Sequence, residues 1–224
     1  MSSQYFFTHS HTHYMLFSDL AVRLAGPHQL QPKPETNALQ FGQNFTDHML
    51  KIHYYETLGG WQRPEIVPME SIVLHPAAKV LHYAVELFEG MKAYRGRDNK
   101  IRIFRPQLNM ARMNVTAVRA GLPTFDGDEL IKCLCRLVNI DQEWVPHSEA
   151  SSLYIRPTLI GIDVSTLTEN RAPNACSMTC NQRRGSGKSK ECLQSVPVMP
   201  IRACTAPNLG YLVCLRHVKN ALDY

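Results

Sequence analysis

The sequence Leu81-His-Tyr-Ala-Val-Glu-Leu-Phe-Glu-Gly-Met-Lys-Ala-Tyr-Arg-Gly96, followed downstream by Ser152-Leu-Tyr-Ile-Arg-Pro157, gives the clearest indication of both fold and site. Both stretches mix aromatic and charged residues, and the first adds two glycines, a mixture that a strand serving only a core would not need. An arginine can hold a carboxylate or phosphate through two hydrogen bonds, and a tyrosine can orient the bound anion. We therefore expect the two stretches to form walls of a small-molecule site.

The second half of the first stretch predicts a β-hairpin. Residues 91–95 and 100–104 favour strands, and they flank a Gly-Arg-Asp-Asn turn at residues 96–99. Further strands are expected at residues 45–55, 71–74 and 153–162. Pro157 interrupts the last of these, so we expect this proline at a bulge or on an edge strand.

Two helices are predicted between these strands. Pro106 begins the first, which ends near Gly121. Asp126 caps the second, and Glu129 completes a capping box. The second helix has one apolar face at helical spacing, made by Leu130, Ile131, Leu134, Leu137 and Val138. Strands come first and helices follow, which indicates an α+β domain with a largely antiparallel sheet and packed helices.

The chain divides into three parts. Residues 1–36 are expected to be a disordered leader, and their alternating histidines could alternatively bind a metal. Residues 37–163 form the folded domain. After Asp163 the composition changes, because all eight Phe and both Trp lie earlier and five of the seven Cys lie later. Residues 164–224 are expected to be an irregular tail, an aberrant or incomplete segment that a frameshift, a misread splice junction or an alternative exon would explain.

Composition limits the function. The 224 residues carry a formal charge of +5, which suits anionic small molecules and is too small to indicate nucleic acid. No apolar run reaches the roughly 18 residues that a membrane span needs. The late cysteines lack paired CxxC spacing, so no metal site is expected.

Six ordered blocks resemble the branched-chain amino acid aminotransferases, which are fold-type IV enzymes dependent on pyridoxal 5'-phosphate. They are Phe45-Thr-Asp-His-Met49, Leu81-His-Tyr83, Glu86-Leu-Phe-Glu-Gly-Met-Lys92, Arg105-Pro-Gln-Leu-Asn-Met-Ala-Arg-Met113, Asp141-Gln-Glu-Trp-Val-Pro146 and Ser152-Leu-Tyr-Ile-Arg-Pro157. The resemblance covers residues 41–163 and implies the small, N-terminal domain of that fold.

The resemblance also assigns roles. Arg112 would hold the cofactor phosphate, although Ala111 replaces the aspartate that usually precedes this arginine. Tyr83 would reach across a homodimer interface into the neighbouring site. Arg156 would meet a substrate carboxylate. The apolar pocket for Leu, Ile or Val would be walled by Phe45, Phe88 and Tyr154. Glutamate and 2-oxoglutarate would serve the second half-reaction.

The same resemblance places the lysine that bonds covalently to the cofactor in a second domain. No lysine of this chain stands in a matching motif, so no catalytic residue is assigned and we expect this chain alone to be inactive. The alternative is a non-catalytic subunit or interaction protein that pairs with a full-length aminotransferase. The compartment is mitochondrial or cytoplasmic, with the family giving a slight preference for the mitochondrion.

Overall fold

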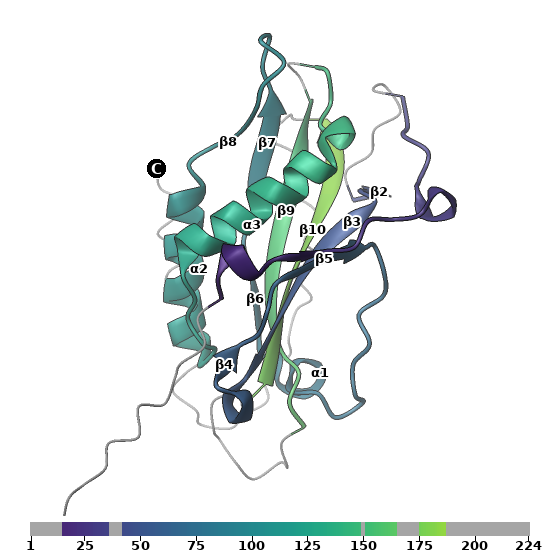
Figure 1. The fold of residues 1–224 in the computed structure, drawn as a ribbon. Coiled ribbons are helices and arrows are strands. Elements are labelled where there is room, and N and C mark those ends of the chain that lie inside the picture. Colours follow the sequence, from purple (N-terminus) through teal and green to yellow (C-terminus); the bar gives the residue numbers. More distant parts are fainter. Residues whose placement is uncertain (1–14, 36–41, 149–150, 165–174, 187–224) are drawn as a thin grey trace, which may run out of the picture. The chain divides into compact units, whose positions relative to one another are not determined.

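The computed structural model describes residues 15–35, 42–148, 151–164 and 175–186. Within them, two long helices lie on a sheet of ten strands (Figure 1). The path through the sheet runs β1 (Ala21–Val22), β5 (Glu65–Pro68), β3 (His48–Tyr55), β10 (Ala175–Ser186), β9 (Ser151–Gly161), β7 (Met91–Arg95) and β8 (Ile101–Ile103). Beside it, β2 (Asn44–Phe45) pairs with β10, β4 (Gly60–Trp61) with β3, and β6 (Glu86–Phe88) with β9.

Among the described strands, β1 and β5 form the one parallel pair. The predicted α+β class with a largely antiparallel sheet is therefore confirmed. The predicted hairpin is confirmed as well, since β7 and β8 pair across the turn, and Asn99 takes up a left-handed conformation there with φ of 59°.

Helix α2 (Pro106–Ala120) begins and ends where the sequence predicts. Proline at the first position needs no hydrogen-bond acceptor for its nitrogen. Gly121 follows the last turn with φ of 68°, a left-handed conformation that glycine adopts without a steric penalty. No helix within the described residues is long and apolar enough to cross a membrane.

Helix α3 (Gly127–Ile140) has the predicted N-cap but not the full capping box. The Asp126 carboxylate accepts hydrogen bonds from the backbone N–H groups of Asp128 and Glu129, at 2.9 and 3.0 Å. The Glu129 carboxylate instead accepts the N–H of Phe17, at 2.6 Å. The glutamate therefore ties the N-terminal segment to the helix, and its predicted role in the capping box is corrected.

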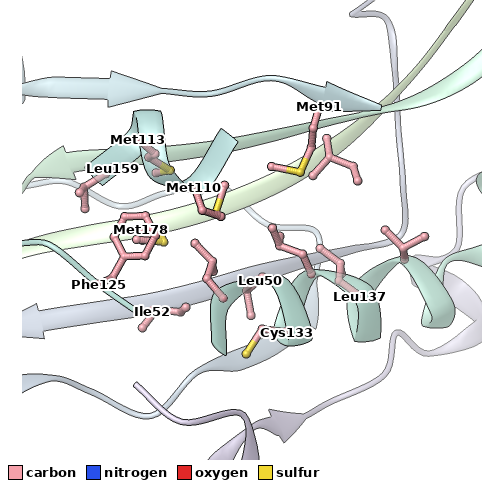
Figure 2. Close-up of a cluster of buried hydrophobic side chains, with 14 of the residues drawn as sticks. Leu50, Ile52, Met91, Met110, Met113, Phe125, Cys133, Leu137, Leu159 and Met178 are labelled. Atoms are coloured by element: carbon pink, nitrogen blue, oxygen red, sulfur yellow. The ribbon is translucent and has the colours of Figure 1, made fainter. Parts of the chain in front are cut away.

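The core lies between the sheet and the two helices (Figure 2). Every second residue of a strand points to the same face, so alternate side chains of β3 and β9 meet the helices. The buried set includes Leu50, Ile52, Leu153, Ile155 and Leu159 from the sheet and Met110, Met113, Leu134 and Leu137 from the helices. Each such buried side chain contributes about 1.5–3 kcal/mol relative to an exposed one. The intervening β9 side chains, Tyr154 and Arg156, are only half-buried and remain available for a site.

Residues 15–35 are ordered against the domain, so the expectation of a disordered leader is wrong for them. Met15 is buried, and β1 pairs with β5. The N–H of Ala25 donates to His48 Nε2 at 2.9 Å. The alternating histidines of the leader, at residues 9, 11 and 13, lie outside the described residues.

The predicted strand at residues 71–74 is also wrong. The segment is irregular, and the side chain of Val73 is 93% exposed while Ile72 is 46% exposed. A short apolar run therefore resembled a buried strand without being one, because a pattern of this length cannot show whether the run is buried.

One regular element appears in the tail that the sequence predicted to be irregular. Strand β10 pairs along its length with β9 and over residues 175–180 with β3. Met178, the fourth residue of the strand, is buried in the core. Residues 165–174 and 187–224 lie outside the described residues, so the correction applies to β10 alone.

Pro157 lies in an inner strand, not on an edge. Strand β9 pairs with β10 on one side and with β6 and β7 on the other. The Pro157 carbonyl accepts the N–H of Glu89 at 3.0 Å, so this residue faces the junction at which β6 gives way to β7. The nitrogen of Pro157 points to the same side. The hydrogen bonds between strands are interrupted at this junction, so the strand loses nothing by lacking an N–H group here.

Candidate substrate and cofactor site

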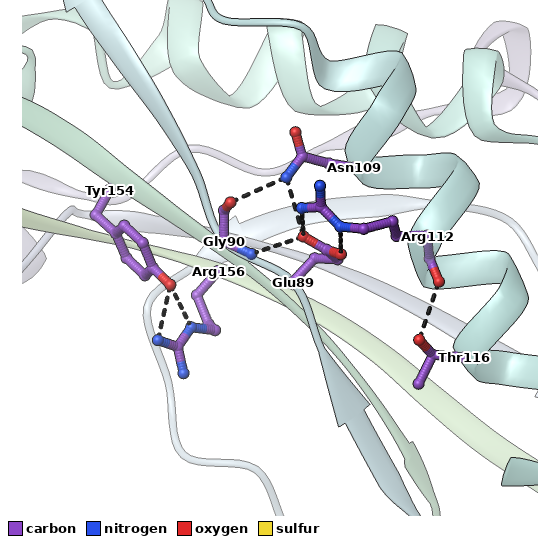
Figure 3. Close-up of polar contacts among 7 residues, drawn as sticks. All are labelled: Glu89, Gly90, Asn109, Arg112, Thr116, Tyr154 and Arg156. Atoms are coloured by element: carbon purple, nitrogen blue, oxygen red, sulfur yellow. Dashed lines mark hydrogen bonds and ion pairs between the residues drawn. The ribbon is translucent and has the colours of Figure 1, made fainter. Parts of the chain in front are cut away.

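The candidate site is built around the short link between β6 and β7. Glu89 and Gly90 form this link, and they lie between the first turns of α2 and the middle of β9 (Figure 3). The link therefore brings residues from the two quoted stretches and from α2 into one region.

Arg112 and Glu89 form a two-bond ion pair on the helix side of this link. Arg112 Nε donates to Glu89 Oε1 and Nη2 donates to Oε2, both at 2.8 Å. The Glu89 side chain is only 11% exposed, whereas that of Arg112 is 64% exposed. Hydrogen bonding to Glu89 and its negative charge raise the pKa of Arg112, which therefore stays charged.

Two more donors complete the surroundings of the Glu89 carboxylate. Asn109 Nδ2 donates to Oε2 at 2.9 Å and also to the Gly90 carbonyl at 3.0 Å. The Gly90 N–H donates to Oε2 at 3.2 Å. Burial favours the protonated acid, but the hydrogen bonds from Arg112, Asn109 and Gly90 outweigh it and hold the pKa of Glu89 below its ordinary value.

Tyr154, Arg156 and Phe88 form a second cluster on the strand side. Arg156 donates from Nε and Nη2 to the Tyr154 hydroxyl, at 3.1 and 2.8 Å. The same guanidinium lies 4.2 Å from the centre of the Phe88 ring, a cation–π contact. A Cβ at Gly90 would lie 2.2 Å from the Tyr154 hydroxyl oxygen, so this approach requires glycine.

A hollow of about 370 Å³ is lined by Arg112 from the first cluster and Tyr154 from the second. It is cationic and partly aromatic, a combination that suits an anion attached to a flat or apolar body. Its lining is made by Gly90, Met91, Lys92, Tyr94, Phe104, Arg105, Leu108, Asn109, Arg112 and Tyr154.

The residues that the sequence singled out fall into three places. Arg112 and Tyr154 line the hollow just described, and Phe88 and Arg156 contact Tyr154 or one another beside it. Phe45 is half-buried in β2 and lines a separate hollow of about 360 Å³. The structure therefore groups four of the six predicted residues and keeps Phe45 apart from them.

Tyr83, the sixth residue, ends helix α1 (Lys79–Tyr83) and is 48% exposed. The helix is anchored to the segment that follows β9 by a buried ion pair between Lys79 Nζ and Asp163 Oδ2, at 2.8 Å. This ion pair holds the short helix in place and leaves the Tyr83 ring at the surface.

Sequence reasoning missed Glu89, Gly90 and Asn109. One signal for Asn109 was present, because it precedes Arg112 by three residues and so shares its side of α2. Glu89 gave no such signal, since its contacts reach a helix 20 and 23 residues away.

No family model matches the chain. Similar curated proteins include cytosolic branched-chain-amino-acid aminotransferases of Caenorhabditis elegans, 56% identical over 146 residues, and Mus musculus, 58% identical over 136 residues. These matches cover 65% and 61% of this chain and 35% of each relative. The mitochondrial enzyme of Bos taurus is 47% identical over 148 residues, covering 66% of this chain and 37% of that protein. The cytosolic relatives are thus the more similar, which gives no support to the preference for the mitochondrion.

Solved structures include a branched-chain aminotransferase of Thermoproteus uzoniensis, with a TM-score of 0.45 and 22% identity over 60% of this chain and 40% of that one. Another, from T.th. and solved with pyridoxamine 5'-phosphate, has a TM-score of 0.43 and 23% identity over 62% and 42% of the two chains. The present chain spans about a third of the length of the curated relatives that it matches. It is a partial homologue of the branched-chain amino acid aminotransferases.

Proposed function

We propose that the described residues supply the phosphate-binding and substrate-facing wall of a branched-chain amino acid aminotransferase site. The observation that carries the proposal is the cationic hollow in which Arg112 and Tyr154 lie on opposite sides of Gly90. The sequence similarity to named aminotransferases supports the same function independently.

The residues around Arg112 fit a phosphate. Glu89 engages Nε and one hydrogen of Nη2, and Nη1 makes no hydrogen bond within the described part of the chain. Lys92 and Arg105 line the same hollow and add positive charge for a dianion. Pyridoxal 5'-phosphate, when bound, supplies an electron sink for charge that develops on a substrate carbon. The chain's own contribution is to hold the phosphate end of that group.

The strand-side cluster fits an amino acid or a 2-oxo acid. Arg156 can bind a carboxylate, and its contact with the Tyr154 hydroxyl fixes the guanidinium against the strand. The Phe88 and Tyr154 rings offer apolar surface for a branched side chain. We propose Leu, Ile and Val as one substrate group and glutamate with 2-oxoglutarate as the other.

We further propose that these 224 residues alone do not complete the reaction. The resemblance places the lysine for covalent bonding in a region beyond the matching blocks, and the chain corresponds to about a third of its relatives. Without that lysine there is no group to form the covalent bond and carry the proton.

The experiment combines binding with turnover. Purified protein should bind pyridoxamine 5'-phosphate in calorimetry and bind it more weakly as Arg112→Ala. It should show no lysine adduct with pyridoxal 5'-phosphate after borohydride reduction, and no amino transfer from Leu to 2-oxoglutarate. Equal binding by the parent and the variant would refute the phosphate role. Turnover with a borohydride-trapped lysine would refute the inactivity.

The exposed side chains of α1 and β6 favour a second function, as a non-catalytic subunit. Leu81, Tyr83 and Phe88 are 58%, 48% and 59% exposed, and exposed apolar side chains of this size suit a protein partner. The proposed partner is a full-length aminotransferase subunit. Tagged chain should co-purify with it after co-expression, and Tyr83→Ser with Leu81→Ser should reduce the recovery. Recovery of the full-length subunit that is unchanged by these substitutions would contradict this use of the surface.

A further inference from the structure

We propose that Glu89 is a positioning residue for Arg112. Its carboxylate holds one edge of the guanidinium, so that the opposite edge is presented to a phosphate in the hollow. The inference rests on the proposed function, because it takes Arg112 to be the phosphate anchor. It adds a residue to the site that neither the sequence motifs nor the similarity to other proteins singled out.

The Glu89 carboxylate is well suited to act as a fixed support. It has about four lone-pair sites, and it accepts four hydrogen bonds: two from Arg112, one from Asn109 and one from the N–H of Gly90. These donors come from two parts of the fold, helix α2 and the link that precedes β7. With 11% of its side chain exposed, the carboxylate has little room to take up another position.

Arg112 needs such a support because most of its side chain is in solvent. A long side chain that is 64% exposed would otherwise sample many rotamers, and ordering it would weaken the binding of any ligand. Within the described residues, Glu89 provides the only ion pair of Arg112. The order of the guanidinium therefore depends on this carboxylate.

The geometry also shows that Glu89 and a phosphate need not compete. A guanidinium has five N–H donors, and Glu89 takes the Nε hydrogen and one Nη2 hydrogen. The other Nη2 hydrogen and an Nη1 hydrogen lie on a different edge, where they can form a second two-bond pair. Lys92 and Arg105 offset the negative charge that Glu89 adds, so the hollow stays attractive to an anion.

The test measures the part of the affinity that depends on the phosphate. Calorimetry on the purified full chain compares pyridoxamine 5'-phosphate with pyridoxamine, which lacks the phosphate. The ratio of the two affinities isolates the phosphate contribution, and a variant that only weakened the fold would lower both affinities. Glu89→Ala should reduce the ratio about tenfold, equivalent to about 1.4 kcal/mol.

Three further proteins make the result specific. Glu86→Ala removes an exposed carboxylate from neighbouring β6 and should leave the ratio unchanged. Glu89→Ala should have no further effect in an Arg112→Ala background, because there is then no guanidinium to position. If Glu89→Ala fails to fold, as judged by circular dichroism, Glu89→Gln removes the charge at nearly constant shape and should also lower the ratio.

The outcomes separate the two proposals. A ratio that falls in Arg112→Ala but is unchanged or higher in Glu89→Ala overturns the positioning role and leaves the proposed function intact; a higher ratio would identify Glu89 as a competitor of the phosphate. A ratio that does not fall in Arg112→Ala overturns the proposed function and this inference with it.

Discussion

Gly90→Ala is the substitution for which the structure gives the clearest expectation. Gly90 has no positive φ, so alanine brings no backbone strain. The added Cβ would lie 2.2 Å from the Tyr154 hydroxyl oxygen and 2.9 Å from its Cζ. Ordinary contact begins near 3.4 Å, so the hydroxyl must retreat by about 1.2 Å.

The free-energy cost follows from what that retreat breaks. Tyr154 would lose its two hydrogen bonds from Arg156, and a hydrogen bond to a charged group contributes about 1.5–3 kcal/mol. The cluster is only half-buried, which favours the lower end. Alanine also reduces the entropy of the unfolded chain, which returns about 0.4–1 kcal/mol. We expect Gly90→Ala to lower the free energy of unfolding by about 2–3 kcal/mol.

Urea unfolding followed by circular dichroism measures this loss as a lower midpoint at an unchanged slope. Gly96→Ala is the matched control, because its Cβ would press on the far ends of the exposed Asp98 and Arg102 side chains and would meet the Lys100 carbonyl oxygen at an ordinary contact distance of 3.6 Å. It should change stability by less than about 0.5 kcal/mol. In a Tyr154→Ala background Gly90→Ala should cost nothing. An equal loss in both backgrounds would refute the reasoning, since the clash would then not be with Tyr154.

Three further predictions concern other parts of the domain. Hydrogen bonds from Arg102 lower the pKa of Asp98 to about 2, so the stability from this pair is present above the unfolded pKa and is lost only as the pH falls through about 2. Arg102→Ala should return the Asp98 titration, followed by NMR, toward about 3.9. Burial raises the pKa of Cys133 to about 12, so iodoacetamide at about pH 8 should label exposed Cys135 before Cys133. Fragment-ion mapping measures the two labelling rates, and equal rates for Cys133 and Cys135 would contradict this. Asp126→Ala should lower the free energy of unfolding by about 1 kcal/mol in thermal unfolding, and Asp126→Asn should recover most of that loss.

The elements that the sequence predicted are those with local causes. The hairpin depends on its own turn, in which Asn99 adopts the left-handed conformation. Helix α3 begins where Asp126 can accept two backbone N–H groups within three residues. In both cases the residues that determine the structure are neighbours in sequence, so a pattern can show them.

The order in residues 15–35 could not be predicted in this way, because it comes from buried polar contacts across long distances in sequence. Asp47 accepts the Trp144 indole N–H at 2.7 Å and the Gln31 N–H at 2.8 Å. His48 Nδ1 lies 2.7 Å from Asp141 Oδ1, while its Nε2 accepts the Ala25 N–H. Asp47 and His48 look like surface residues in a hydrophobic pattern. Their burial is favourable only because these distant partners satisfy them.

The candidate site shows the same division. Phe88, Tyr154 and Arg156 were grouped by sequence because the two stretches combine aromatic and charged residue types that suit an anionic substrate, and the structure brings them into contact. Phe45 was placed with them by resemblance and lies instead in another hollow. Glu89 could be recognised only from the structure, because its importance lies in which donors surround it and not in its own sequence neighbours.

Gly90 connects the two halves of the site. Its N–H donates to the Glu89 carboxylate, and its carbonyl accepts from Asn109, so its main chain belongs to the half that holds Arg112. Because Gly90 has no side chain, it also leaves the space that the Tyr154 hydroxyl occupies in the other half of the site. A larger residue here would act on the two halves differently: it would displace Tyr154 directly, and it would reach Arg112 only through a shift of the main chain. The spacing between the proposed phosphate and carboxylate sites therefore depends on the main chain of this one residue and on its lack of a Cβ.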